Sequence, residues 1–394
     1  MDLAFSKEDE DFRSEFRSWL DTNLPAEMRT REWWRPKSDT EQFQIRREWE
    51  KSKAEAGFCG IQWPTEFGGR GGTPTMKAIY DEEMTKSNAP RTVNPLGLAF
   101  LGPTVMAIGT DEQKRDIIKP LLHTDVIWCQ GFSEPGAGSD LAALQLKAED
   151  QGENWLLNGQ KIWTTNAMHG DKIFTLARTG QGSKKHEGIS MLLVDMNQPG
   201  VEARPLKQIT GESEFGEVFY TDAICPKTEV LGGTDNGWMT AMLLLSFERG
   251  SSAIGQYTEF KGMWNEVASI AKQVPRGSST ADQDPVLRQK LADSLVELEC
   301  LKYLSWHVLT QSSQGKDLGY EASMTKIMWS ETFRKVSDTY EAVVGSAFSV
   351  DEAMGLTLDE LTTLALWSRS CTIWGGSQQV QRTIVSERVL GLPR

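Results

Sequence analysis

Apolar residues recur at helical spacing through the first third of the chain. The pattern predicts a helix that ends before Pro25 and a second from about Asp39 to Gly57, with further helices over residues 75–87 and after Thr110. Residues 57–72 hold six glycines and one proline, which is typical of an ordered loop. We therefore expect an N-terminal helical domain over residues 1–125.

The pattern changes near Val126. From there to about Gly233, short apolar or alternating runs, at 173–177, 189–194 and 218–220, are separated by glycine-containing turns. Helical patterns do not separate these runs, so we expect an antiparallel sheet or barrel and not a βαβ fold. The predicted middle β domain spans residues 126–234.

Helical spacing returns after Gly237 and continues toward the C-terminus. The helical segments cover residues 243–271, 285–311, 320–344, 358–373 and 377–390. They predict a C-terminal helical bundle over residues 235–394. The expected fold class is therefore a multi-domain α+β protein with a helical, a β and a second helical domain.

Composition excludes several classes of function. The 394 residues carry 42 Lys and Arg against 55 Asp and Glu, a formal net charge of −13 that disfavours nucleic acid as a partner. Apolar runs are shorter than the roughly 20 residues of a membrane span, and no secretory signal is recognisable. Five scattered cysteines without a CxxC pair, and four histidines without ligand spacing, favour a cytoplasmic protein with neither disulfides nor a metal site.

Two segments of the middle region could carry chemistry. In QGFSEPGAGSD (130–140), glycines allow a ligand close to the backbone and free N–H groups can meet an anion, although a simple turn between helix and sheet explains the segment equally well. In NGQKIWTTN (158–166), a Trp beside Thr hydroxyls suits stacking on a flat ring, and the alternative is a Trp in the sheet core.

Two further segments lie in the C-terminal region. On a helix, Glu248 has leucines one turn before it and the small residues Ser251, Ser252 and Gly255 after it, so a ligand could fit beside a carboxylate of raised pKa. The alternative is a surface Glu or an ion pair. In WGGSQQVQR (374–382), Gly-Gly-Ser before a helix leaves free amides that could bind an anion or simply cap the helix.

The order and spacing of these segments resemble the acyl-CoA dehydrogenase family over nearly the whole chain. SEPGAGSD, KIWTTN and WGGSQQVQR are similar to signature segments of that family, and GTDEQKR (109–115) resembles the approach to the first of them. The resemblance implies FAD as cofactor, a C-terminal four-helix bundle, and a homodimer or homotetramer. It also implies acyl-CoA as substrate and an electron-transfer flavoprotein or similar acceptor as partner.

The resemblance also implies roles for individual residues. Ser139 and Arg249 should contact the acyl-CoA. The backbone N–H of Gly375 should meet the thioester carbonyl. The expected cofactor contacts are Gln130, Phe132, Ser133, Gly138, Ser139, Trp163, Thr165, Arg288, Gly345, Ser377, Gln378 and Gln379. The segment around Gly345 departs from the usual glycine pair of the family.

The main departure lies at position 375. Many members carry the catalytic Glu there, and glycine cannot accept a proton. A subset resembling the isovaleryl-CoA enzymes places the base on the first bundle helix in a Glu-Arg pair, which Glu248-Arg249 matches. We therefore expect Glu248 to be the catalytic base.

The expected activity is α,β-dehydrogenation of an acyl-CoA thioester to the 2-enoyl-CoA. The small residues around Glu248 and at 375 favour a bulky or branched acyl group, as in fatty-acid or sterol side-chain oxidation, unless other residues fill that space. One alternative is the catalytic subunit of a heteromeric acyl-CoA dehydrogenase, such as a heterotetramer. Another is an oxygen-using flavin monooxygenase or oxidase on the same fold.

Overall fold

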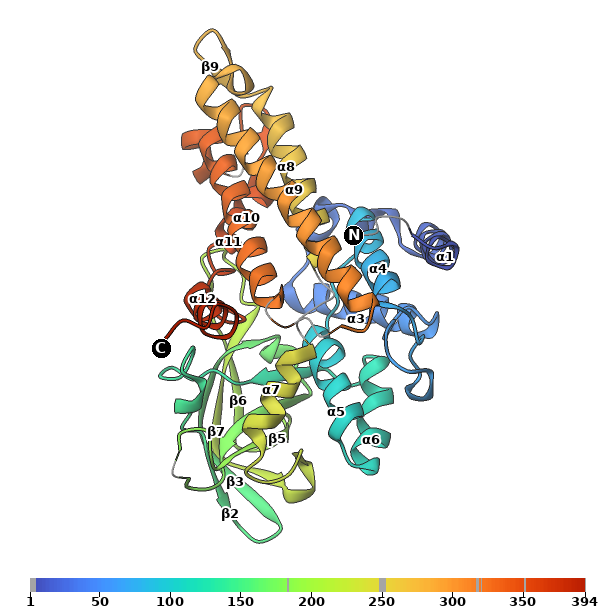
Figure 1. The fold of residues 1–394 in the computed structure, drawn as a ribbon, viewed down its shortest axis with the longest axis vertical. Coiled ribbons are helices and arrows are strands. Elements are labelled where there is room, and N and C mark those ends of the chain that lie inside the picture. Colours follow the sequence, from blue (N-terminus) through green and yellow to red (C-terminus); the bar gives the residue numbers. More distant parts are fainter. Residues whose placement is uncertain are drawn as a thin grey trace. The chain divides into compact units, whose positions relative to one another are not determined.

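The computed structural model describes residues 5–182, 184–247, 253–316, 319, 321–350 and 352–393. The chain forms two compact units (Figure 1). Unit 1 consists of residues 1–23, 74–88 and 250–394, and unit 2 of residues 24–73 and 89–249. The two N-terminal helices α1 and α4 thus belong to the same unit as the C-terminal bundle.

Unit 2 is built around an eight-stranded sheet. Its strands follow the order β6-β7-β3-β2-β4-β5-β8, with β1 paired to β4. They are β1 (Trp128–Gly131), β2 (Lys147–Asp150), β3 (Asn154–Thr165), β4 (Lys172–Arg178), β5 (Ile189–Asp195), β6 (Val201–Pro205), β7 (Phe215–Pro226) and β8 (Val230–Leu231).

Most strand pairs are antiparallel, as the sequence predicts. The β1–β4 and β2–β4 pairs are parallel. This differs from a purely antiparallel expectation because the chain between β1 and β4 contains the β2–β3 hairpin and returns to the same end of the sheet. Alternating burial along β3 and β7 places one face of these strands in the core.

Helices of unit 2 pack around this sheet. They include α2 (Arg31–Trp34), α3 (Asp39–Glu55), α5 (Gly102–Ile108), α6 (Asp111–Leu122) and α7 (Gly237–Phe247). The helix predicted after Thr110 is α6, and it begins with a capping box, in which the Thr110 hydroxyl accepts from the Gln113 amide and the Gln113 side chain accepts from the Thr110 amide. Helix α7 contacts β5, and both are labelled in Figure 1.

Unit 1 is helical. It contains α1 (Lys7–Asn23), α4 (Pro74–Lys86), α8 (Ala253–Ala271), α9 (Pro285–Ser313), α10 (Glu321–Val344), α11 (Asp359–Ser368) and α12 (Gln378–Ile384), with a π-helical turn at Val385–Val389. Helix α10 contacts α8, α9, α11 and α12, and its Phe333 ring stacks on Phe260 at 4.5 Å. The short hairpins β9 (Pro275–Arg276) with β10 (Ser279–Thr280) and β11 (Glu352–Ala353) with β12 (Leu356–Thr357) complete the unit.

The cysteines are free thiols. Four of them are buried and Cys300 on α9 is exposed. Burial raises the pKa of Cys129 and of Cys225 to about 12. Among the described residues, no helix has the length and apolar character needed to cross a membrane, and no group of three His, Cys, Asp or Glu side chains could hold a metal ion.

Candidate active site

The segment after β1 forms a tight, partly open loop in unit 2. Glu134 and Ala137 exchange two backbone hydrogen bonds of 3.1 and 3.0 Å, which close a turn around Pro135 and Gly136. A Cβ atom added at Gly136 or Gly138 would meet nothing within 4 Å. Packing within the chain therefore does not require glycine here, and the bare backbone is open to a ligand.

The second predicted segment lies at an irregularity of β3. The register between β3 and β7 shifts between Lys161 and Thr164, which is the signature of a β-bulge. Trp163 sits in this bulge with φ 60°, a left-handed conformation that is rare for a bulky residue. Its side chain is 57% exposed, and its ring meets Phe215 edge-on at 6.0 Å. Strain of this kind is typical of functional sites because it aims a side chain where packing alone would not.

The two segments are joined directly. The Ile162 amide donates a 2.9 Å hydrogen bond to the Ser133 carbonyl, and the Lys161 ammonium donates to the Phe132 carbonyl at 3.1 Å. The half-buried Ser133 keeps its amide and hydroxyl without a partner among the described residues. An exposed aromatic ring and two free donors thus lie on adjoining pieces of backbone.

The other predicted residues of unit 2 occupy different environments. Gln130 is half-buried in β1 opposite Phe174, and the Phe132 ring packs perpendicular to Phe174 at 6.0 Å in the core. Thr165 is half-buried at the end of β3 and Ser139 is exposed. Phe132 can therefore contribute backbone, but not its ring, to a surface ligand.

In unit 1, the turn at Trp374 is fixed by side chains of α10. The Lys326 ammonium lies 4.1 Å from the ring centroids of both Trp329 and Trp374, and it donates a 2.7 Å hydrogen bond to the Cys371 carbonyl. The Trp374 indole N–H also donates to the Ser370 hydroxyl at 3.0 Å. The exposed turn that follows is consequently held in one position.

Two glycines of this turn have left-handed backbone conformations, which favour glycine. Gly375 has φ 63° and Gly376 has φ 84°, both left-handed. A Cβ at Gly376 would lie 2.2 Å from the Gln381 side-chain nitrogen. Ser377 then caps α12, its hydroxyl accepting from the Val380 amide at 3.3 Å.

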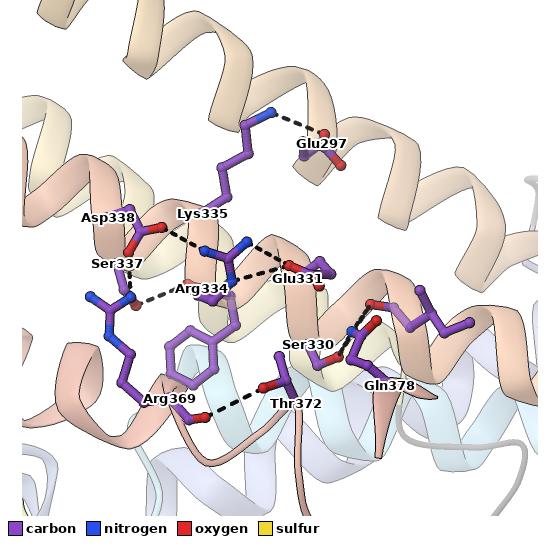
Figure 2. A network of polar contacts seen from close by, with 12 residues as sticks. Glu297, Ser330, Glu331, Arg334, Lys335, Ser337, Asp338, Arg369, Thr372 and Gln378 are labelled. Carbon is purple, nitrogen blue, oxygen red and sulfur yellow. Dashed lines mark hydrogen bonds and ion pairs between the residues drawn. The ribbon is translucent and has the colours of Figure 1, made fainter. Parts of the chain in front are cut away.

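A polar network ties the chain before this turn to α10 (Figure 2). Arg369 contacts Asp338 and bonds Glu341 at 3.1 Å, while Arg334 bonds Asp338 at 3.0 Å. Figure 2 also shows Gln378 reaching Ser330, at 2.8 Å, and it donates to the Ile327 carbonyl as well. The buried Gln378 side chain is thus directed into α10, whereas Gln379 is exposed.

Two predicted contacts lie elsewhere in unit 1. Arg288 is exposed in the first turn of α9. Gly345 follows α10 with φ 60°, and a Cβ there would stand 3.6 Å from the Arg276 guanidinium. That guanidinium donates to the Ala342 and Val343 carbonyls at the end of α10. Glu248 and Arg249 lie outside the described residues.

Comparison with protein families identifies the chain. The models of the N-terminal, middle and C-terminal domains of acyl-CoA dehydrogenase match residues 6–125, 129–223 and 235–390. The chain belongs to the acyl-CoA dehydrogenase family. It is an oxidoreductase that acts on CH–CH bonds, and its three-domain fold is the one the sequence predicts.

Three relatives are similar to this acyl-CoA dehydrogenase over nearly their whole length. Acyl-CoA dehydrogenase IpdE1 of Mycobacterium tuberculosis is 38% identical over 98% of each chain. The ChsE4–ChsE5 complex from Mycobacterium tuberculosis superposes with a TM-score of 0.86 at 28% identity, covering 100% of each chain. The Tcur3481–Tcur3483 steroid acyl-CoA dehydrogenase gives a TM-score of 0.85 at 27% identity, again over 100% of each chain.

Members of the family use FAD, and the unit 2 site of this acyl-CoA dehydrogenase fits such a group. A flavin has a flat ring, acceptor atoms at its edge and a phosphate-bearing tail. Trp163 offers an exposed ring face, Ser133 offers two donors that have no partner in the described part of the chain, and the open backbone at Gly136 and Gly138 offers room for close approach.

Sequence reasoning missed two basic residues of this acyl-CoA dehydrogenase. Lys161 stands between Gln160 and Ile162, and nothing in this local pattern marks it as buried or indicates its partner. The sequence does not indicate the contacts of Lys326, because its two aromatic partners lie three and 48 positions away and share no periodic pattern with it.

Proposed function

We propose that this acyl-CoA dehydrogenase removes two hydrogens from the α and β carbons of an acyl-CoA thioester whose acyl group is bulky or branched, such as a sterol side chain. The observation that carries the proposal is the joined site of unit 2, where the strained Trp163 adjoins the free donors of Ser133. FAD, when bound, supplies the hydride acceptor.

The residues of the chain have separate tasks in this proposal. Glu248 takes the proton from the α carbon, because Gly375 has no side chain to do so. The Gly375 amide donates to the thioester carbonyl and stabilises negative charge developing there. Ser133, Thr165 and Trp163 would hold the flavin, and Ser139 and Arg249 would hold the acyl-CoA.

The proposed substrate class is supported by the names of similar proteins. One solved relative is called a steroid acyl-CoA dehydrogenase, at 27% identity over 100% of both chains. Glycine at 375 removes a side chain from the position at which many family members carry the base. Both points favour an acyl group larger than a short straight chain.

Anaerobic reduction of the bound flavin tests the proposal. Loss of oxidised-flavin absorbance is measured after adding acyl-CoA thioesters with steroid-derived, branched and straight acyl groups. We expect bulky groups to react fastest and Glu248→Gln to slow reduction at least about a hundredfold. The control variant Glu112→Gln, at an exposed position of α6, should react like the wild type. Undiminished reduction in E248Q would remove Glu248 as the base, and a preference for short straight chains would remove the substrate class.

A heteromeric assembly is the second candidate. Two similar solved structures, ChsE4–ChsE5 and Tcur3481–Tcur3483, carry two chain names each. If this chain is the catalytic half of such an assembly, the chain purified alone should bind less than one FAD and regain it with its partner. Full FAD occupancy and activity of the isolated chain would support a homodimer or homotetramer.

Electron-transfer flavoprotein, or a similar carrier, is the proposed acceptor of the electrons. Rapid peroxide formation in air would instead indicate an oxygen-using oxidase or monooxygenase. We also propose that residues 1–125, 126–234 and 235–394 are the three domains, supported by family matches over 6–125, 129–223 and 235–390. The free cysteines favour a reducing, cytoplasmic setting.

A further inference from the structure

A buried ion pair connects the two segments that contain Ser133 and Trp163, and it has no role in the proposed function. The Lys161 ammonium is 2.7 Å from Glu134, and their side chains are 0% and 8% exposed. Glu134 also accepts the backbone amides of Gln145 and Leu146, at 2.6 and 2.9 Å. Each partner belongs to one of the two segments, Glu134 to SEPGAGSD and Lys161 to KIWTTN.

Stability alone does not explain this pair. A buried ion pair is usually no more stabilising than apolar residues of the same volume, because removing two charges from water costs about as much as their attraction returns. The ammonium, however, makes a contact that an apolar side chain could not make. It donates a 3.1 Å hydrogen bond to the carbonyl of Phe132.

That hydrogen bond orients Ser133. In a trans peptide the carbonyl and the following N–H point in opposite directions, so fixing the Phe132 carbonyl toward Lys161 turns the Ser133 amide away from the buried pair. The Ser133 carbonyl is fixed as well, since it accepts from the Ile162 amide at 2.9 Å. The peptide groups on both sides of Ser133 are thus held, and its amide and hydroxyl remain available.

The same lysine adjoins the other side of the site. Lys161 is the last residue of β3 in regular register with β7, pairing with Val218, before the bulge that carries Trp163. Anchoring Lys161 in the core therefore fixes where the left-handed turn of the strand begins. Lys161 thus holds the peptide group before Ser133 through its side chain, and it holds the start of the bulge that carries Trp163 through its backbone.

We propose that Lys161 is a positioning residue for the flavin site, acting through its hydrogen bond to the Phe132 carbonyl, with Glu134 as its buried ion-pair partner. The inference rests on the proposed function, because it takes the ligand of Ser133 and Trp163 to be the flavin ring. Lys161 itself does not touch that ligand. It determines which donors of Ser133 face the ligand and from where Trp163 extends.

Three variants separate this role from a purely structural one. Lys161→Met keeps the aliphatic stem and removes the ammonium. Glu134→Gln keeps the Lys161 amine, which can donate to the Phe132 carbonyl in its charged or its neutral form. The double variant K161M/E134Q removes both charges, and Lys147→Met, with a side chain 64% exposed on β2, is the matched control.

Each variant is measured in two ways: the unfolding temperature of the apoprotein, and the affinity and absorbance band shape of added FAD. The single variants should unfold at lower temperature because each leaves an unpaired buried charge, and the double variant should recover at least half of that loss. FAD binding should be weakened roughly tenfold or more in both K161M and K161M/E134Q, since both lack the amine that donates to the Phe132 carbonyl. E134Q should bind FAD within about threefold of the wild type and give the wild-type band shape.

Recovery of both stability and FAD affinity in the double variant would overturn the proposal, as would wild-type FAD affinity and band shape in K161M. If K161M does not fold, E134Q decides: a wild-type flavin spectrum supports the proposal and a loss of FAD refutes it. These readouts are independent of turnover. A wild-type protein that binds FAD but is reduced by no acyl-CoA thioester would refute the proposed function and leave the Lys161 comparison intact.

Discussion

Lys326 is the residue whose removal should most disturb the turn that carries Gly375. Its ammonium bonds the Cys371 carbonyl and lies between the rings of Trp329 and Trp374. A hydrogen bond with a charged donor contributes about 1.5–3 kcal/mol, and each cation–π contact about 0.5–1 kcal/mol. These contributions are not additive, and a Met side chain retains the packing of the stem, so we expect Lys326→Met to cost about 2–4 kcal/mol.

Thermal unfolding provides the assay. For a unit of this size, about 1 kcal/mol corresponds to roughly 2–4 °C, so the transition that includes α10 should fall by roughly 5–10 °C. The matched control is Lys335→Met on the same helix. Lys335 pairs with Glu297 at 3.0 Å, but both side chains are 40% exposed, and such surface pairs contribute about 0–1 kcal/mol.

A functional consequence should accompany the loss of stability. The contacts of Lys326 with Cys371 and Trp374 hold the turn that contains Gly375. K326M should therefore raise the KM for acyl-CoA about tenfold or more while the protein still binds FAD. Unfolding of K326M within 1–2 °C of K335M, roughly the effect of one surface contact, would refute the assigned stabilisation. An unchanged KM in a clearly destabilised K326M would show that the contacts of Lys326 stabilise the helical bundle but do not position the turn at Gly375 for the substrate.

Three further predictions concern stability. Burial alone would raise the pKa of Glu83, but hydrogen bonds from Arg17 and Arg13 outweigh it and lower that pKa. Glu83→Gln should therefore cost about 3 kcal/mol at pH 7. The difference from wild type in denaturant melts should begin to shrink as pH falls through the pKa of Glu83 in the unfolded chain, and should be lost only below its lowered pKa in the folded protein. Burial, opposed by Glu134 and assisted by Arg178, lowers the pKa of Lys161 to about 8. Above that pH the unfolded chain binds more protons at this site than the folded protein does, so the lysine stabilises the fold increasingly as pH rises. In urea melts at pH 7–10, the free energy of unfolding of wild type minus that of K161M should therefore rise by up to about 1.4 kcal/mol per pH unit above pH 8. Gly188→Ala should cost at least about 2 kcal/mol in the same melts, because Gly188 has φ 68° and a Cβ would lie 2.3 Å from the Gly180 carbonyl; a loss below about 0.5 kcal/mol would contradict the clash.

Local patterns in the sequence were sufficient for most elements of the fold. The capping box at Thr110, the loop at 57–72 and the long helices of the bundle follow from periodicity and short-range side-chain chemistry, which act within a few residues. The parallel β1–β4 pair did not follow, because it depends on how a 40-residue connection returns to the sheet. The grouping of α1 and α4 with the C-terminal helices likewise depends on contacts between distant segments.

The candidate site divides in the same way. The segments containing Ser133 and Trp163 could be found from their residue types and spacing. The left-handed backbone of Trp163 could not, because nothing in its own type favours φ 60° and the bulge arises from pairing with β7. The Lys161–Glu134 pair joins residues 27 positions apart, a separation that no helical or strand period relates.

The uneven exposure of the five sulfur atoms offers a practical tool for counting subunits. A maleimide reagent needs an accessible thiol, and Cys300 is exposed while the other four cysteines are buried. A single fluorophore per folded chain should therefore attach on α9. Stepwise photobleaching of single assemblies would then reveal how many copies of this chain each particle contains, and whether unlabelled mass remains for a second kind of subunit.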